Sequence, residues 1–193
     1  MDPLHKYVLP APWALWGVSW LAGLRGNKPA VRRETAMQRH AHVVPMVLAG
    51  ALVAVPQLPF GVLDDRVLPR NLTGLAGGTG LALAGLLWCA WARVSLGRNW
   101  SGSVTIKADH QLVTTGPYAW LRHPIYAGLL LAFLGSALAL GEWSGVLAFM
   151  ICLFALWAKW RREDAWLAAA FGETYAQYRQ RVPTLIPFPR SER

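Results

Sequence analysis

The feature that most limits how this chain can fold is a series of five apolar runs along its 193 residues. The runs lie at Val8–Leu24, Val43–Leu63, Leu72–Ala92, Ile125–Leu140 and Ser144–Trp160. A helix that crosses a bilayer needs about 20 apolar residues, or about 17 at the short limit. The runs therefore predict an all-α, multi-pass integral membrane protein with about five transmembrane helices. Because the first run and the last two are short, buried helices of a soluble bundle are the alternative.

Composition and charge favour the membrane interpretation. Hydrophobic residues make up 54% of the chain and charged residues only 15%, which is apolar for a soluble domain of this length. Sixteen of the nineteen Lys and Arg residues fall on one side of the five predicted spans, in 25–42, 93–123 and 159–193. Since cytoplasmic loops are enriched in Lys and Arg, we expect the C-terminus in the cytoplasm and the N-terminus outside. The basic surface fits anionic lipid headgroups, so we expect membrane lipids and no nucleic acid as partners.

Two regions of the chain differ in their connections. Residues 1–92 hold three runs, which are separated by a basic loop (25–42) and then by a short turn (64–71). Residues 93–193 begin with about 30 residues that precede the fourth run, a length typical of a functional or disordered segment. The fourth and fifth runs are separated by only three residues, which predicts a helical hairpin. Residues 161–188 then place apolar side chains on one helical face and predict a C-terminal amphipathic helix.

Polar residues stand at both open ends of the predicted hairpin. Arg122, His123 and Tyr126 enter its first helix, and Glu163 and Asp164 follow its second. Because the connecting turn is tight, we expect these two clusters to meet at one membrane surface. One interpretation is purely structural, with Arg122 paired to an acidic residue and His123 at the level of the headgroups. The other is a functional site, since ionisable residues at membrane depth often have functional roles.

The residues around these clusters resemble a known family. HQLVTTGPYAWLRHPIYAG is followed after about 35 residues by the acidic pair and then by FGETYAQYRQRVPTLIPF. These two blocks, in this order and spacing, resemble the isoprenylcysteine carboxyl methyltransferases, integral-membrane enzymes related to phospholipid methyltransferases. The resemblance covers roughly Leu96–Phe188, so residues 93–193 would form the methyltransferase core. Residues 1–92 resemble the family only in hydropathy, and we interpret them as a scaffold that shapes an acceptor pocket.

The resemblance implies transfer of a methyl group from S-adenosylmethionine, with S-adenosylhomocysteine as product, at the cytoplasmic face. The acceptor would be lipophilic: a prenylcysteine-like carboxylate, an isoprenoid acid or a lipid phenol. A carboxylate acceptor needs no base, whereas a phenol or amine would have to lose a proton to His123, His110 or a carboxylate. The resemblance does not choose among these acceptors.

The resemblance also assigns roles to individual residues. The residues that correspond to cofactor-binding positions are Pro117, Tyr118, His123, Tyr126, Gly128, Glu163 and Asp164. A carboxylate and aromatic faces would suit the sulfonium and ammonium groups of the cofactor. Arg122 would orient an anionic acceptor, and with His123 it completes the predicted catalytic pair. The family more often has two glutamates at the acidic pair, so the shorter Asp164 is a departure from its pattern.

Three further expectations follow from single residues. Asn99 and His110 lie in the polar segment and are additional candidates for the site. The chain has two cysteines, both inside apolar runs and without an accompanying histidine cluster, so we expect no metal ion.

Two rival functions remain open at the level of sequence. Membrane reductases of the sterol type, which use NADPH, carry a similar R-H-P-x-Y-x-G block. They usually have Asn where this chain has Ile125 and an acidic residue where it has Leu129, and both differences favour the methyltransferase. A non-catalytic membrane protein of the same fold would tolerate a changed acidic pair, but His123, Tyr126 and Glu163 are all retained.

Overall fold

The computed structural model describes residues 8–22, 30–55, 61–107 and 111–186. The helices of this part of the chain are α2 (Pro10–Ala22), α3 (Ala36–Ala54), α4 (Leu72–Leu96), α5 (Pro124–Leu140), α6 (Trp143–Phe171) and α7 (Glu173–Arg181). Three short 3-10 helices, η1 (Gly61–Asp64), η2 (Gly97–Asn99) and η3 (Gly116–Ala119), lie in the connections. Strands β1 (Ala30–Arg33) and β2 (Thr105–Lys107) form a small antiparallel ribbon, which was not predicted. The predicted helical architecture is confirmed.

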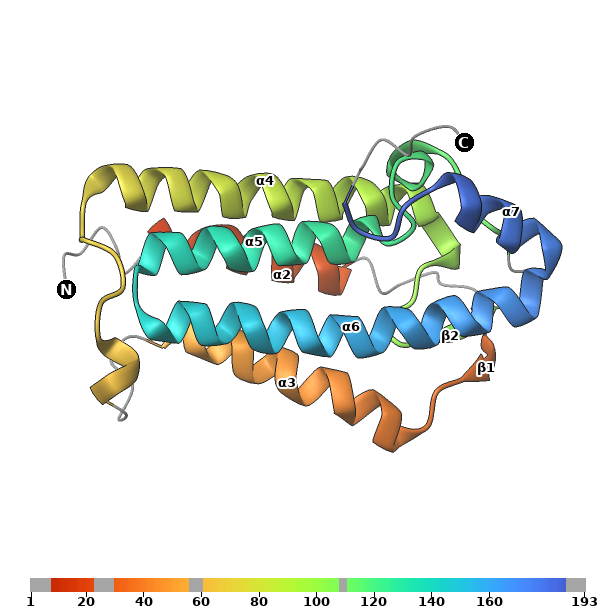
Figure 1. Cartoon of the computed structure of the whole chain (residues 1–193), viewed down its shortest axis with the longest axis horizontal. Coiled ribbons are helices and arrows are strands. Elements are labelled where there is room, and N and C mark those ends of the chain that lie inside the picture. The colour runs from red at the N-terminus through yellow and green to blue at the C-terminus, as the bar shows by residue number, and fades with distance from the viewer. Residues whose placement is uncertain (1–7, 23–29, 56–60, 108–110, 187–193) are drawn as a thin grey trace.

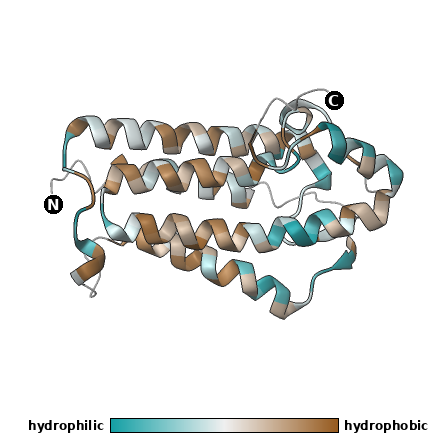
Figure 2. Cartoon of the chain, viewed as in Figure 1, coloured by the Kyte–Doolittle hydropathy of each residue, from teal (hydrophilic) through white to brown (hydrophobic). Residues whose placement is uncertain are grey.

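The long helices run side by side, as Figure 1 shows. α4 packs along α5, α5 and α6 form the predicted hairpin, and α3 packs along α6. Gly141 ends α5 in the left-handed conformation (φ 63°), so the chain reverses within three residues. Figure 2 shows that hydrophilic residues gather at the two ends of the helices, most densely at the end that carries α7 and β1. The polar ends of α5 and α6 lie at that densely polar end.

Glycines let α4 and α5 approach closely. A Cβ atom added to Gly85 would lie 2.5 Å from the carbonyl oxygen of Gly128, and one added to Gly135 would lie 2.4 Å from the amide nitrogen of Ala82. No side chain fits at such distances, so backbone meets backbone along this interface. Small residues have the same role between helices in membranes, where close packing replaces the hydrophobic driving force.

The number of membrane spans differs from the prediction. Within the described residues, two helical segments are long and apolar enough to cross a bilayer, Leu72–Asn99 and Trp143–Phe171. α5 is apolar but has only 17 residues. α3 begins at Ala36, seven residues before the predicted run, because Thr35 and Gln38 form a capping box, and it ends at Ala54. The predicted count of five spans is therefore not confirmed, although the helices have membrane character.

The C-terminal region also differs from the prediction. α6 continues beyond Trp160 to Phe171, because no residue in this stretch interrupts a helix. Gly172 (φ 51°, ψ −125°) then separates α6 from α7, so the predicted single amphipathic helix is two helices. The predicted apolar face nevertheless exists: Tyr175, Tyr178 and Val182 form a buried cluster with apolar residues of α6.

Candidate functional site

One cavity of about 470 Å³ connects the polar end of the hairpin with an apolar compartment. Trp13 and Trp16 of α2, Met46 of α3 and Phe133 of α5 lie along the apolar part. The polar part is lined by the side chains of Asn99, Ser101, Ser103, Thr105, Gln111, Arg122, His123, Tyr126, Lys159 and Glu163. A single space therefore adjoins both charged groups and a surface suited to a hydrocarbon chain.

Asp164 joins the two polar clusters beside this cavity, through contacts with two of its lining residues. Its Oδ2 atom lies 2.6 Å from Nη1 of Arg122, and its Oδ1 atom lies 2.7 Å from Nε2 of His123. The hydroxyl of Tyr175 in α7 also donates to Oδ1. α5, α6 and α7 thus meet at one carboxylate, as expected from the polar ends of the hairpin.

Arg122 has its remaining donors engaged by the segment that follows α7. Its Nε donates to the carbonyl oxygen of Val182 at 3.1 Å, and its Nη2 donates to Oγ1 of Thr184 at 2.6 Å. Burial works to lower the pKa of Arg122, but the hydrogen bond with Tyr175 and the charge of Asp164 outweigh it and raise the pKa above its usual value. The guanidinium is therefore permanently charged and held by protein groups, which does not support the predicted contact with an anionic acceptor.

α7 is fixed over the site by a second tyrosine. The hydroxyl of Tyr178 donates to the carbonyl oxygen of Tyr118 at 2.6 Å. Burial raises the pKa of Tyr178 to about 12, so the hydroxyl keeps its proton and remains a donor at neutral pH. Tyr118 in turn lies against the cavity.

Glu163 and His123 face the cavity together with Tyr126. The hydroxyl of Tyr126 donates to Oε2 of Glu163 at 2.5 Å, and Nδ1 of His123 lies 3.8 Å from the same oxygen. The rings of His123 and Tyr126 are stacked, with centroids 5.3 Å apart. Because Nε2 of His123 is engaged with Asp164, Nδ1 is the ring nitrogen directed to Glu163.

The structure separates the predicted site residues into two groups. Tyr118, Arg122, His123, Tyr126 and Glu163 line the cavity. Three others, Pro117, Gly128 and Asp164, are not among its lining residues.

The second group has packing or anchoring contacts instead. A Cβ atom on Gly128 would lie 2.7 Å from Sγ of Cys89, so this glycine serves the α4–α5 interface. Pro117 is buried inside η3. Asp164 contacts Arg122 and His123, which line the cavity, but does not line it itself. These positions favour supporting roles over the predicted direct contact with cofactor.

Of the two further candidates, Asn99 lines the cavity, and its Oδ1 atom is buried without a hydrogen-bond partner among the described residues. His110 lies outside the described residues.

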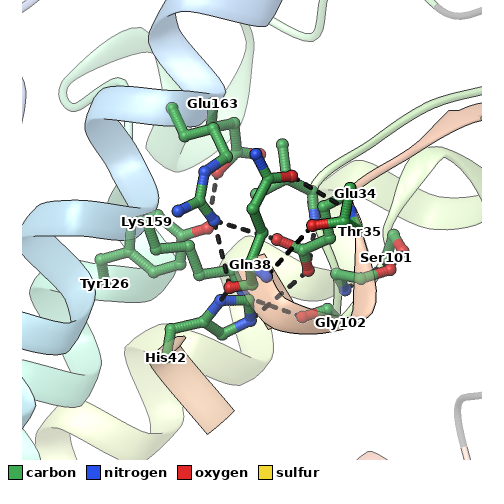
Figure 3. A network of polar contacts seen from close by, with 12 residues as sticks. Glu34, Thr35, Gln38, His42, Ser101, Gly102, Tyr126, Lys159 and Glu163 are labelled. Carbon is green, nitrogen blue, oxygen red and sulfur yellow. Dashed lines mark hydrogen bonds and ion pairs between the residues drawn. The ribbon is translucent and has the colours of Figure 1, made fainter. Parts of the chain in front are cut away.

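The sequence interpretation missed a network beside Glu163, which Figure 3 shows. Glu34, whose side chain is 1% exposed, lies 3.2 Å from Nη1 of Arg162 and accepts from the amide nitrogen of Val104 at 3.2 Å. Nε2 of His42 lies 3.6 Å from Glu34. Lys159 belongs to the same region and donates from Nζ to the carbonyl oxygen of Gly102 at 2.7 Å.

One of these residues had a signal in the sequence. Lys159 precedes Glu163 by four residues, so the two share a helical face. Nothing comparable marked Glu34, because its ion-pair partner Arg162 is 128 residues away.

Comparison with known proteins places the chain in a family. The sequence model described as phospholipid methyltransferase matches residues 73–174, just over half of the chain. The chain belongs to the phospholipid methyltransferase family. The matched segment contains α5, α6 and every predicted site residue from Pro117 to Asp164.

Individual relatives of this methyltransferase family member support the resemblance to isoprenylcysteine methyltransferases. The chain is 39% identical over 99 residues to the protein-S-isoprenylcysteine O-methyltransferase of Schizosaccharomyces pombe, covering 50% of this chain and 42% of that protein. It is 33% identical over 100 residues to protein-S-isoprenylcysteine O-methyltransferase B of Arabidopsis thaliana, covering 50% and 51%. The predicted relationship to isoprenylcysteine methyltransferases is confirmed.

A relative with a different name matches a longer part of the chain. The cobalt-zinc-cadmium resistance protein CzcN of Cupriavidus metallidurans is 38% identical over 147 residues, which cover 75% of this chain and 60% of that protein. Within the described residues, no group of three or more His, Cys, Asp or Glu side chains could hold a metal ion. The chain spans about half the length of the curated relatives it matches.

Proposed function

We propose that this protein transfers a methyl group from S-adenosylmethionine to a lipophilic acceptor in the membrane. The observation that carries the proposal is the continuous cavity, which adjoins Glu163 and Tyr126 at one end and the tryptophans of α2 at the other. The polar end lies in the segment matched by the phospholipid methyltransferase family. Relatives named as protein-S-isoprenylcysteine O-methyltransferases support the same class of reaction.

The cavity suits the cofactor in size and in chemistry. Its volume of about 470 Å³ is within the range of about 300–1,000 Å³ that is common for small-molecule sites. Buried acceptor atoms without a partner among the described residues, Oδ1 of Asn99 and Oγ1 of Thr105, belong to residues of its wall and suit the hydroxyl and amine donors of an adenosine. The bound cofactor would supply an electrophilic methyl group on a cationic sulfur. The carboxylate of Glu163 and the ring of Tyr126 would attract that cation.

The residues around Glu163 would mainly position the reactants. Tyr126 donates to Glu163 and so limits the orientations of its carboxylate. Asp164 fixes His123 and Arg122, which keeps the wall of the cavity rigid. Methyl transfer depends on alignment and on the exclusion of water, and both follow from such a wall.

His123 has a second possible use that depends on the acceptor. With Asp164 accepting from Nε2, the lone pair of Nδ1 is available at the cavity. A phenol or amine acceptor would deliver its proton to this nitrogen. A carboxylate acceptor would leave His123 with a binding role alone.

The apolar part of the cavity would hold the hydrocarbon chain of the acceptor. Trp13 and Trp16 contribute from α2, and Met46 contributes from α3, so the N-terminal helices would form most of this pocket. This arrangement supports the scaffold role expected for residues 1–92. The polar end of the cavity would face the cytoplasm, as the distribution of Lys and Arg favours.

Calorimetric titration of the detergent-purified protein tests the proposal. We expect saturable binding of S-adenosylhomocysteine and no binding of NADPH in a parallel titration. Binding of NADPH alone would identify a reductase. The absence of binding by either ligand, in a sample that is monodisperse, would leave a non-catalytic membrane role.

A further inference from the structure

A cation other than Arg122 faces the middle of the cavity. The donors of Arg122 point to Asp164, Tyr175, Val182 and Thr184, so the guanidinium has little left to offer a ligand. Lys159 of α6 also lines the cavity. The structure gives its Nζ atom a single hydrogen bond, to the carbonyl oxygen of Gly102, although an ammonium group has three donors.

Lys159 has no carboxylate within 4 Å of Nζ among the described residues. The buried carboxylate of Glu34 is close by but is engaged with Arg162 and the amide of Val104. The ring of Tyr126, 5.5 Å from Nζ, is the other favourable neighbour. An ammonium group away from bulk water is costly unless an anion pairs with it. The surroundings therefore suit an anionic ligand.

The position of Lys159 along α6 indicates which part of a ligand it would meet. Leu156, Lys159, Glu163 and Leu167 follow one another on the cavity face of the helix. Lys159 lies one turn from Glu163 in the direction of Leu156 and the apolar compartment. Figure 3 shows Lys159 beside Tyr126, with Glu163 on the next turn. The side chain of Lys159 thus leaves the helix between the apolar compartment and the turn that carries Glu163, and its ammonium group reaches the carbonyl oxygen of Gly102.

We propose that Lys159 binds the carboxylate of the methyl acceptor and thereby selects lipophilic acids over alcohols and amines with the same hydrocarbon chain. This inference rests on the proposed methyltransferase function and assigns a specificity-determining residue to the same site. It moves the contact that the sequence assigned to Arg122 onto a residue with free donors.

Charge neutrality in the cavity supports an acid as the acceptor. Among the described lining residues the formal charges are those of Arg122, Lys159 and Glu163, and Arg122 is neutralised by Asp164 behind it. Lys159 and Glu163 cancel, so a cofactor with one net positive charge leaves the site cationic. An acceptor carboxylate restores neutrality, which matters in a medium of low dielectric constant.

The chemical step is also complete with these groups. One carboxylate oxygen forms a bond to the methyl carbon as the carbon–sulfur bond breaks, and the electron pair of that bond stays on sulfur. No proton moves, so no base is required. The charges of the two reacting groups disappear together, and the low dielectric of the site favours such a change.

The test compares three ligands that share one hydrocarbon chain: farnesoic acid, farnesol and farnesylamine. The tryptophans that line the cavity report binding through their fluorescence, in detergent and with saturating S-adenosylhomocysteine. Variants K159M and K159R are compared with R161M. Arg161 lies on the same helix, faces outward and stacks on Trp157, so R161M removes the same charge outside the cavity.

We expect K159M to raise the Kd of farnesoic acid about tenfold or more, because a charge-assisted hydrogen bond is lost. The Kd of farnesol should change by less than about twofold, since it makes no ion pair with Lys159. K159R should retain most of the affinity for the acid, and R161M should resemble the unaltered protein. The ratio of acid to alcohol affinity within each variant is independent of any loss of folded protein.

Three results would overturn the inference. Equal changes for acid and alcohol would mean that Lys159 has only a structural role. An unchanged Kd for the acid together with weaker S-adenosylhomocysteine binding would assign Lys159 to the carboxylate of the cofactor. Preferential binding of farnesylamine would indicate an amine acceptor. S-adenosylhomocysteine binding is titrated on the same sample of unaltered protein. If it does not bind, the proposed methyltransferase function itself is wrong, which distinguishes that result from a failure of the Lys159 inference alone.

Discussion

At the scale of single residues, Asp164 and Glu163 are adjacent carboxylates with different surroundings. The side chain of Asp164 is 15% exposed and contacts Arg122, His123 and Tyr175, whereas the side chain of Glu163 is 35% exposed and lines the cavity. Neighbours on a helix point in directions about 100° apart, which separates them. The two residues should therefore respond differently to loss of charge.

Asp164→Asn should destabilise the protein. Arg122, with a side chain that is 6% exposed, would lose its ion pair, and removal of one partner of such a pair costs about 3 kcal/mol. The measurement is thermal unfolding in detergent followed by tryptophan fluorescence. Glu173→Gln, on the exposed surface of α7, is the control and should leave the melting temperature unchanged. Equal melting temperatures for both variants would contradict the anchoring role of Asp164.

Glu163→Gln should instead weaken binding of S-adenosylmethionine by about tenfold, because the charge-assisted contact with its cationic sulfur is replaced by a neutral one. Its melting temperature should stay close to that of the unaltered protein. Calorimetric titration of the same preparation measures the affinity. An unchanged affinity would remove Glu163 from the cofactor site.

At the scale of elements, the α4–α5 interface depends on glycines, which have no side chain to hold the two helices apart. Gly85→Ala would place a methyl group 2.5 Å from the carbonyl oxygen of Gly128 and should cost about 1–3 kcal/mol. Gly80→Ala in the same helix meets nothing within 4 Å and should be neutral or stabilise by about 0.5–1 kcal/mol. Thermal unfolding of the two variants measures the difference. A melting temperature for Gly85→Ala at or above that of Gly80→Ala would show that the helices separate easily.

The elements differ in how far the sequence predicts them. The hairpin followed from its apolar runs and the three residues between them, since local spacing determines the turn. The end of α6 at Phe171 was missed because hydropathy falls at Arg161, and a fall in hydropathy ends a span without ending a helix. Gly172, followed by Glu173, is the sequence signal for the end of one helix and the start of the next.

At the scale of the whole molecule, the site depends on contacts between distant parts of the chain. Trp13 donates from its indole nitrogen to Oγ of Ser136 at 3.0 Å, across 123 residues of sequence. Glu34 and Arg162 pair across 128 residues. The pairing of the hairpin ends was predictable because a tight turn brings them together. The contributions of α2 and α3 to the site were not predictable, because no local sequence pattern indicates which helices will pack against each other.

Orientation in the membrane is also a property of the whole molecule. If the polar end of the bundle faces the cytoplasm, a fluorescent protein fused after Arg193 should fluoresce and alkaline phosphatase fused there should be inactive. Fusions that end at Arg70, next to the opposite end of α4, should give the reverse pattern. Active phosphatase at the C-terminal fusion would invert the proposed topology.

The segment after α7 has a consequence for biosynthesis. The amide nitrogens of Arg122 and His123 donate to the carbonyl oxygens of Pro183 and Thr184. A ribosome makes residues 183 and 184 only after all six described α-helices, so Arg122 and His123 obtain these two backbone partners only once α7 has been made. The site is therefore completed at a late moment of translation, and until then the amide groups of Arg122 and His123 lack these two acceptors.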